Sequence, residues 1–265
     1  MSPRDSVPVW AAIPRRQLVA RLVDASESLV LISAPPGWGK MALVRQWMHT
    51  DRRPSVCIHL EHEDNDPVVF LKRLTVALRG LVQLDPAVTT WLELPEVPLD
   101  ELVMPTVKTA IACERPILLG LLDAQVLENA ACWTVIRRLV DAEDSRLTLT
   151  IVTRTDPPLP LARLRAEARL LEIRAEELAF DREEAEALLD LIGAGVSDEE
   201  VGHLLARTEG WAVGLALAAL AIKQHSADQV VPSLRGDQRE IAEYLASEVI
   251  SLQAPEVVGF LECTS

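Results

Sequence analysis

The feature that most constrains this chain is a short apolar run that leads directly into a glycine-containing loop. Leu29–Ser33 has the composition of a buried strand, and Ala34–Met41 reads Ala-Pro-Pro-Gly-Trp-Gly-Lys-Met before a helical pattern begins. A strand before and a helix after is the context required of the phosphate-binding loop template G-x-x-x-x-G-K-[ST]. Gly37 and Gly39 allow the backbone to turn its N–H groups toward phosphate oxygens, and Lys40 adds positive charge. The loop therefore predicts a nucleotide site, for ATP or ADP.

Two positions depart from this template. Ala34 replaces the first glycine, which is tolerable where its φ is negative. Met41 replaces the Ser/Thr whose hydroxyl ligates Mg²⁺, and a thioether is a poor ligand for a hard cation. A glycine-rich turn that binds no ligand is the alternative interpretation. The predicted nucleotide-contacting residues of the loop are Ala34, Pro35, Pro36, Gly37, Trp38, Gly39, Lys40 and Met41.

Short apolar runs alternate with helical patterns up to about residue 178, which is typical of a parallel α/β sheet with helices on both faces. The predicted strands are Leu29–Ser33, Val56–Leu60, Ile117–Leu122, Leu147–Thr153 and Leu170–Ile173. The predicted helices between them are Lys40–Met48, Pro67–Leu81, Leu99–Cys113, Asn129–Val140 and Leu161–Ala166.

After about Phe180 only helical patterns follow. Asp181 with Glu184, and Ser197 with Glu200, have the spacing of capping boxes, and Gly193 is placed to end the first of these helices. Further helices are expected over Trp211–Lys223 and Gln238–Leu252. We expect the sequence to be a fragment, because it stops inside what looks like the next helix.

The net charge of −14 makes direct contact with DNA or RNA an unfavourable function for this segment. The cysteines and histidines lack metal-ligand spacing, so no metal site is predicted from them. No export signal or membrane-spanning run is evident, and a cytoplasmic location is expected.

Two charged residues follow strand ends and are candidates for chemistry. Asp123 ends the run Ile117–Leu122 and is the candidate catalytic acid, because P-loop hydrolases place a carboxylate at the end of a buried strand. An Asp that only starts a turn is the alternative. Arg154 follows the next strand and is a candidate sensor of a γ-phosphate, with a plain Arg-Thr-Asp loop as the alternative.

Several longer stretches resemble one family. They are IPRRQLVARL, SAPPGWGKMALVRQW, LEHEDNDPVVFLKRLTVALR, TRTDPPLPLARLRAEARLLEIRAEELAF, RTEGWAVGLALAAL and AEYLASEVISLQAPEVVGFLECTS. The chain resembles the nucleotide-binding (NB-ARC/NACHT-like, STAND) module of the large ATP-binding LuxR-type transcriptional regulators, the family of the maltose-regulon activators. The resemblance covers almost the whole chain, and the family's C-terminal helix-turn-helix is not present in it.

The resemblance implies a P-loop NTPase domain over residues 1–178, a helical domain over 179–225 and the beginning of a winged-helix region over 226–265. By resemblance, Pro14 and Arg15 lie near the adenine and Arg154 is the sensor arginine. The segment Gly210-Trp211 matches the element that closes over the nucleotide.

The resemblance also exposes two departures on the metal side. The family strand ends in two aspartates, of which the first, a Mg²⁺-shell residue, is Leu122 here and the second is Asp123. Met41 stands where the family has Thr. We therefore expect a nucleotide-binding regulatory switch with weak or absent hydrolysis, with self-association or a protein partner as further expectations. A working ATPase and a nucleotide-free scaffold are the alternatives.

Overall fold

The computed structural model describes residues 9–82, 84, 86, 105–108, 115–142, 146–225 and 227. The chain groups into two compact units. The sheet unit consists of Arg16–Ala34 and Leu43–Arg174. The helical unit consists of Met1–Arg15, Pro35–Ala42 and Ala175–Ser265, so the glycine-containing loop belongs to it from Pro35 onward.

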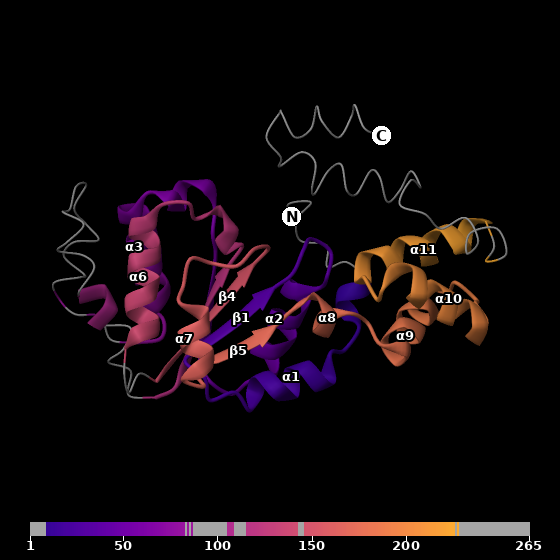
Figure 1. The fold of residues 1–265 in the computed structure, drawn as a ribbon, viewed down its shortest axis with the longest axis horizontal. Coiled ribbons are helices and arrows are strands. Elements are labelled where there is room, and N and C mark those ends of the chain that lie inside the picture. The colour runs from indigo at the N-terminus through magenta and orange to yellow at the C-terminus, as the bar shows by residue number, and fades with distance from the viewer. Residues whose placement is uncertain are drawn as a thin grey trace. The chain divides into compact units, whose positions relative to one another are not determined.

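The sheet unit is built on a five-stranded sheet in which every pairing is parallel (Figure 1). The spatial order is β2-β3-β4-β1-β5, so β4 lies between β1 and β3. The register of β1 and β4 places Ser33 beside Thr153 at the carboxyl ends of both strands. The strands are β1 (Leu29–Ser33), β2 (Ser55–His59), β3 (Ile117–Leu122), β4 (Leu147–Thr153) and β5 (Leu170–Ile173).

The three inner strands are buried at every residue, whereas the edge strands β2 and β5 are partly exposed. Strands covered on both faces are expected to be apolar throughout, and this pattern predicted four of the five strands with their observed bounds. Strand β2 begins and ends one residue before its predicted bounds. Leu60 nevertheless donates its N–H to the carbonyl of Leu122 at 2.9 Å just after β2 ends.

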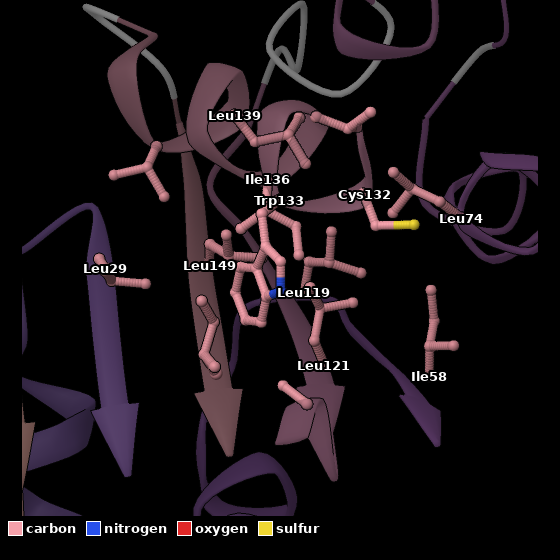
Figure 2. Packing of buried hydrophobic residues seen from close by; sticks show 14 of the residues in the cluster. Leu29, Ile58, Leu74, Leu119, Leu121, Cys132, Trp133, Ile136, Leu139 and Leu149 are labelled. Atoms are coloured by element: carbon pink, nitrogen blue, oxygen red, sulfur yellow. The ribbon is translucent and has the colours of Figure 1, made fainter. Parts of the chain in front are cut away.

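One face of the sheet is covered by α3 (Pro67–Leu78) and α6 (Ala130–Asp141). The odd-numbered residues of β1, β3 and β4 point to this face, since side chains alternate along a strand. Figure 2 shows the indole of Trp133 lying over the sheet beside Leu119 and Leu149. Its Nε1 donates to the carbonyl of Leu127 at 2.8 Å, so the buried ring leaves no indole donor unsatisfied.

Helix α2 (Lys40–Thr50) covers the opposite face. Gly120 in the middle of β3 points to that face, and a Cβ there would lie 3.1 Å from Met48 Cε of α2. Helix α1 (Arg16–Val23) was not predicted from the sequence, and it buries Val19 and Leu22. Helix α7 (Leu161–Ala166) has its predicted bounds and buries Leu164 in the α3–α6 core. The expectation of helices on both faces is confirmed.

The helical unit contains α8 (Ala175–Leu178), α9 (Arg182–Ile192), α10 (Asp198–Thr208) and α11 (Ala212–His225). It also includes the N-terminal 3-10 helix η2 (Val9–Ala12). Both predicted capping boxes are present, because Asp181 and Ser197 accept from the N–H groups of Glu184 and Glu200. Gly193 ends α9 at φ 77°, a left-handed conformation that favours glycine. The unit has a core of its own, which includes Ile13, Phe180, Leu188, Leu204 and Leu215.

Two expected helices fall wholly or partly outside the described residues. Of Leu99–Cys113 only residues 105–108 are described, and they are helical. The expected helix Gln238–Leu252 and nearly all of the expected winged-helix beginning, residues 226–265, lie outside them. In the described part of the chain, no helix is long and apolar enough to cross a membrane.

Candidate phosphate-binding site

The glycine-containing loop follows directly from β1. Ala34 donates its N–H to the carbonyl of Thr153 at 3.3 Å, which continues the pairing of β1 with β4 for one residue. Gly37 and Gly39 then adopt φ values of 81° and 83°, which L side chains rarely adopt. Ala34 is not among the residues of positive φ, so replacing the template's first glycine imposes no left-handed strain there. Local backbone geometry therefore explains which glycines this loop needs.

Lys40 opens helix α2 directly after the second left-handed glycine. Its side chain is only 8% exposed, and its Nζ donates to the carbonyl of Pro35 at 2.8 Å. The ammonium group is thus folded over the loop that precedes it. A helix N-terminus, a lysine and a turn of left-handed glycines together form the arrangement that binds phosphate groups. The residues present fit a nucleotide phosphate.

The loop also contacts the beginning of α11 within the helical unit. Trp211 Nε1 donates to the carbonyl of Pro36 at 3.1 Å, and the N–H of Val213 donates to the carbonyl of Gly37 at 3.2 Å. On another side, a Cβ at Gly39 would lie 3.9 Å from the Trp10 ring. Trp211 was expected to close over the nucleotide, and in the structure its indole N–H binds the loop backbone.

Arg15 is engaged by the helical unit, whereas the neighbouring Pro14 is exposed. The Arg15 side chain is 5% exposed. Its guanidinium donates to the carbonyl of Leu178 at 2.7 Å and lies 2.9 Å from a carboxylate oxygen of Glu184. It also stacks over the ring of Phe180 at 4.9 Å. Burial lowers the pKa of Arg15, and burial raises the pKa of Glu184 against the opposing effect of the arginine charge. Contact of Arg15 with adenine remains a prediction.

A chain of polar contacts crosses the carboxyl ends of three strands in the sheet unit. Asp123 follows β3 at φ 58°, and its carboxylate lies 3.3 Å from His59 Nε2 at the end of β2. Gln125 donates to the same carboxylate at 2.9 Å. The carbonyl of the Gln125 side chain accepts from the backbone N–H of Arg154 at 3.2 Å. The chain therefore ties the candidate acid to the backbone of the candidate sensor arginine.

Asp123 begins the 3-10 helix η4 (Ala124–Val126), as a turn-forming Asp would, and its carboxylate has His59 and Gln125 as polar partners at the strand end. A non-glycine residue with positive φ is uncommon and marks either a turn or a functional position. A catalytic role for Asp123 remains a prediction.

Neither of the two residues that were compared with the family's Mg²⁺ positions, Met41 and Leu122, suits this cation. Met41 presents a thioether that is 40% exposed, and Leu122 at the end of β3 is a buried aliphatic side chain. Neither offers the oxygen ligands that this cation requires. Among the described residues, no group of three or more His, Cys, Asp or Glu side chains is arranged to hold a metal ion.

Sequence reasoning missed His59, Gln125, Trp10 and Val213 as neighbours of these candidates. His59 and Gln125 carry a weak signal, because His59 is the last residue of β2 and Gln125 lies three residues after β3, at the edge where parallel sheets place their functional groups. Val213 contributes only its backbone N–H, so no side-chain pattern could identify it.

Strand order and loop geometry together define the class. A buried parallel sheet in the order β2-β3-β4-β1-β5, with a lysine-containing loop after β1, is the fold of the P-loop ATPases. Solved structures agree at the level of fold. The Walker-type ATPase of Pyrococcus abyssi gives a TM-score of 0.57 at 12% identity, covering 94% of this chain and 75% of its own. Cdc6p from Pyrobaculum aerophilum gives a TM-score of 0.51 at 18% identity, covering 92% and 74%.

Comparison with curated proteins narrows the relationship. The chain is 29% identical over 256 residues to the HTH-type transcriptional regulator MalT of Serratia proteamaculans, covering 93% of this chain and 28% of that protein. It is also 29% identical over 266 residues to the serine/threonine-protein kinase PknK of Mycobacterium tuberculosis, covering 97% of this chain and 24% of that protein. The chain thus spans about a quarter of the length of these relatives. No family model matches it. It is a P-loop ATPase-like module homologous to part of the MalT regulators.

Proposed function

We propose that this chain is the nucleotide-binding switch module of a LuxR-type, STAND-class transcriptional regulator and that it holds ATP or ADP with little or no hydrolysis. The observation that carries the proposal is the loop itself. Gly37 and Gly39 have left-handed backbones, and the buried Lys40 opens α2 immediately afterwards. This geometry suits a polyphosphate whether or not a metal accompanies it.

The second part of the proposal, weak hydrolysis, rests on Met41 and Leu122. Both positions that would serve one Mg²⁺ ion carry side chains without oxygen, while the phosphate-side residues remain. Asp123, Arg154 and Trp211 are retained as candidate acid, sensor and closing residue. A nucleotide bound without cleavage acts as a ligand, which shifts a two-state equilibrium by its differential affinity for the two states.

The wider setting is part of the same proposal. The module works in the cytoplasm. Residues 1–178 act as its NTPase domain and residues 179–225 as its helical domain, and residues 226–265 begin a winged-helix region. Its partners are a nucleotide and protein surfaces, including a second copy of itself. The net charge of −14 supports the absence of direct nucleic-acid contact by this segment.

The test is equilibrium binding of fluorescent ATP and ADP analogues to the full chain, with and without EDTA. We expect binding in both conditions and at least about tenfold weaker binding for Lys40→Ala, because charge-assisted contacts to phosphate are the stronger hydrogen bonds. Lys72→Ala on α3 is the matched control and leaves binding unchanged. Absence of binding by the parent chain would establish the scaffold alternative.

Hydrolysis is tested separately by single-turnover measurement with Mg²⁺. We expect the parent chain to match the Lys40→Ala variant. A rate well above that variant would show a working ATPase and contradict the second part of the proposal.

A further inference from the structure

Three consecutive carbonyl groups of the phosphate loop each accept a hydrogen bond within the helical unit. The carbonyl of Pro35 accepts from Lys40 Nζ at 2.8 Å, and that of Pro36 accepts from Trp211 Nε1 at 3.1 Å. The carbonyl of Gly37 accepts from the N–H of Val213 at 3.2 Å. The carbonyl groups of the loop are therefore held by Trp211, just before α11, and by Val213, in the first turn of α11. Lys40 of the loop itself holds the third.

These hydrogen bonds also fix where the loop's N–H groups point. The C=O and N–H of a trans peptide unit point in opposite directions. Because the carbonyls of Pro36 and Gly37 are directed at Trp211 and Val213, the N–H groups of Gly37 and Trp38 are directed away from them. Pro35 and Pro36 have no N–H, so these are the first amide donors of the loop after Ala34. Orienting such amides in advance is what an anion site requires.

The indole of Trp211 packs against Gly214, where a larger residue would clash with the ring. A Cβ at Gly214, one turn along α11, would lie 2.5 Å from Trp211 Cε3. The backbone N–H of Trp211 donates to the carbonyl of Thr208 at 2.9 Å, and Gly210 before it has a φ of 74°. The ring is thus positioned by the turn between α10 and α11 and by the absence of a side chain at Gly214.

The hydrogen bond from Val213 also satisfies a donor at the start of α11. The first N–H groups of a helix lack partners within the helix and must find an acceptor elsewhere. Val213 is the second residue of α11, and its N–H uses the carbonyl of Gly37. Any rearrangement of the loop therefore exposes an unsatisfied helix donor, which couples the two elements energetically.

We propose that Trp211 is a positioning residue for phosphate: its indole N–H, with the N–H of Val213, holds the loop so that the amides of Gly37 and Trp38 are oriented for a polyphosphate. This inference rests on the proposed nucleotide binding and adds that Trp211 acts on the phosphate part of the ligand through the loop backbone. This role differs from a direct contact between the Trp211 ring and the adenosine part of the nucleotide.

The binding experiment compares ADP, inorganic pyrophosphate and adenosine on the full chain by calorimetry. Trp211→Phe retains a ring and removes the indole donor. We expect it to weaken ADP and pyrophosphate by the same factor, about 2- to 12-fold for one hydrogen bond, and to leave adenosine unchanged. If Trp211→Phe loses affinity for ADP and adenosine but not for pyrophosphate, the ring contacts the nucleoside directly and the inference is overturned. Unchanged affinity for pyrophosphate overturns it in any case.

Trp133→Phe is the matched control, because Trp133 Nε1 also donates to a backbone carbonyl but lies in the sheet core. It lowers thermal stability without changing pyrophosphate affinity. Gly214→Ala is the second variant: it displaces the indole while favouring the helix, and we expect the same loss of pyrophosphate affinity as for Trp211→Phe.

Hydrogen exchange of the ligand-free chain separates this inference from nucleotide binding itself. We expect the amide of Val213, which donates to the carbonyl of Gly37, to exchange several-fold faster in Trp211→Phe than in the parent chain, because the loop is then held by one hydrogen bond fewer. Unchanged exchange would overturn the inference even if ADP binds. If the parent chain binds neither ADP nor pyrophosphate, the proposed function fails, and the inference that Trp211 prepares a phosphate site fails with it. Faster exchange would then show only that Trp211 holds the loop.

Discussion

The backbone N–H of Phe180 donates to the carbonyl of Gly210 at 2.9 Å, which joins the chain before α9 to the turn before α11. The two backbones are so close that a Cβ at Gly210 would lie 2.8 Å from the Phe180 carbonyl oxygen. Gly210 also has a φ of 74°. Two independent constraints therefore require glycine at this position.

Gly210→Ala should lower the free energy of unfolding of the helical unit by about 2–5 kcal/mol, from left-handed strain and overpacking together. Gly195→Ala is the control. It also has a positive φ, of 61°, but nothing lies within 4 Å of the added carbon, so it should cost only about 1–2 kcal/mol. Urea unfolding followed by circular dichroism measures both, and equal losses would refute the contribution from Phe180.

Arg15→Met should destabilise the helical unit by about 3 kcal/mol, because it leaves the Glu184 carboxylate, 17% exposed, without its charged partner. Arg16→Met changes the same charge at an exposed neighbour and should be nearly neutral. Thermal unfolding gives the comparison. Binding of adenosine to the same variants tests the predicted contact of Arg15 with the base, and a loss there at unchanged stability would show that contact to be the main role.

Gly120→Ala should cost about 1–3 kcal/mol of stability, because the added carbon would lie 2.7 Å from Cys57 Sγ on the neighbouring strand. Cys57→Ala removes that sulfur. In a double-mutant cycle, Gly120→Ala should therefore cost less in the Cys57→Ala background than in the parent chain. Additive losses would show that Met48, at 3.1 Å, or the backbone sets the cost.

Glu172 on the edge strand β5 should give the sheet unit a component of acid sensitivity. Hydrogen bonds from Arg165 lower the pKa of Glu172 from its ordinary 4.5 to about 2, opposed by burial and assisted by Arg174. Because the folded pKa is the lower one, this stabilisation is complete above about pH 4.5 and is lost as pH falls toward 2.

The measurement is the urea midpoint of the parent chain and of Glu172→Gln at pH 5.5 and pH 3.5. We expect the variant to be less stable than the parent chain at pH 5.5, and the difference between their urea midpoints to be smaller at pH 3.5. Glu176→Gln removes the same charge from α8, outside this network, and should show no such narrowing. A gap that is constant with pH would rule out the ion pairs as its source.

Local patterns were enough to predict the strands, the capping boxes and the loop. Largely apolar runs predicted the inner strands because both faces of the sheet are covered. Gly37 and Gly39 were predictable because the left-handed φ values that the loop needs favour glycine. Helix α1 was not predicted, because it has only eight residues and buries just two of them, Val19 and Leu22, which leaves a short apolar period in the sequence.

Contacts between distant segments could not be predicted in the same way. Trp211 and Pro36 are 175 residues apart, and Arg15 and Leu178 are 163 apart. Neither pair leaves a periodic or spaced pattern in the sequence, and the donors bind backbone carbonyls, which every residue carries. The role of a side chain toward another segment's backbone therefore becomes visible only when the fold places them together.

The discontinuous make-up of the helical unit has a consequence during protein synthesis. Ile13 and Arg15 are made early, but their partners Phe180 and Glu184 emerge from the ribosome well over a hundred residues later. At translation rates of about 5–20 residues per second, that delay is roughly 8–35 seconds. The sheet unit, which ends at Arg174, is complete only just before Phe180 appears. The phosphate loop receives its bonds from Trp211 and Val213 later still, once α11 has been synthesised. In each newly made chain, the loop is thus the last part of the site to reach its final conformation.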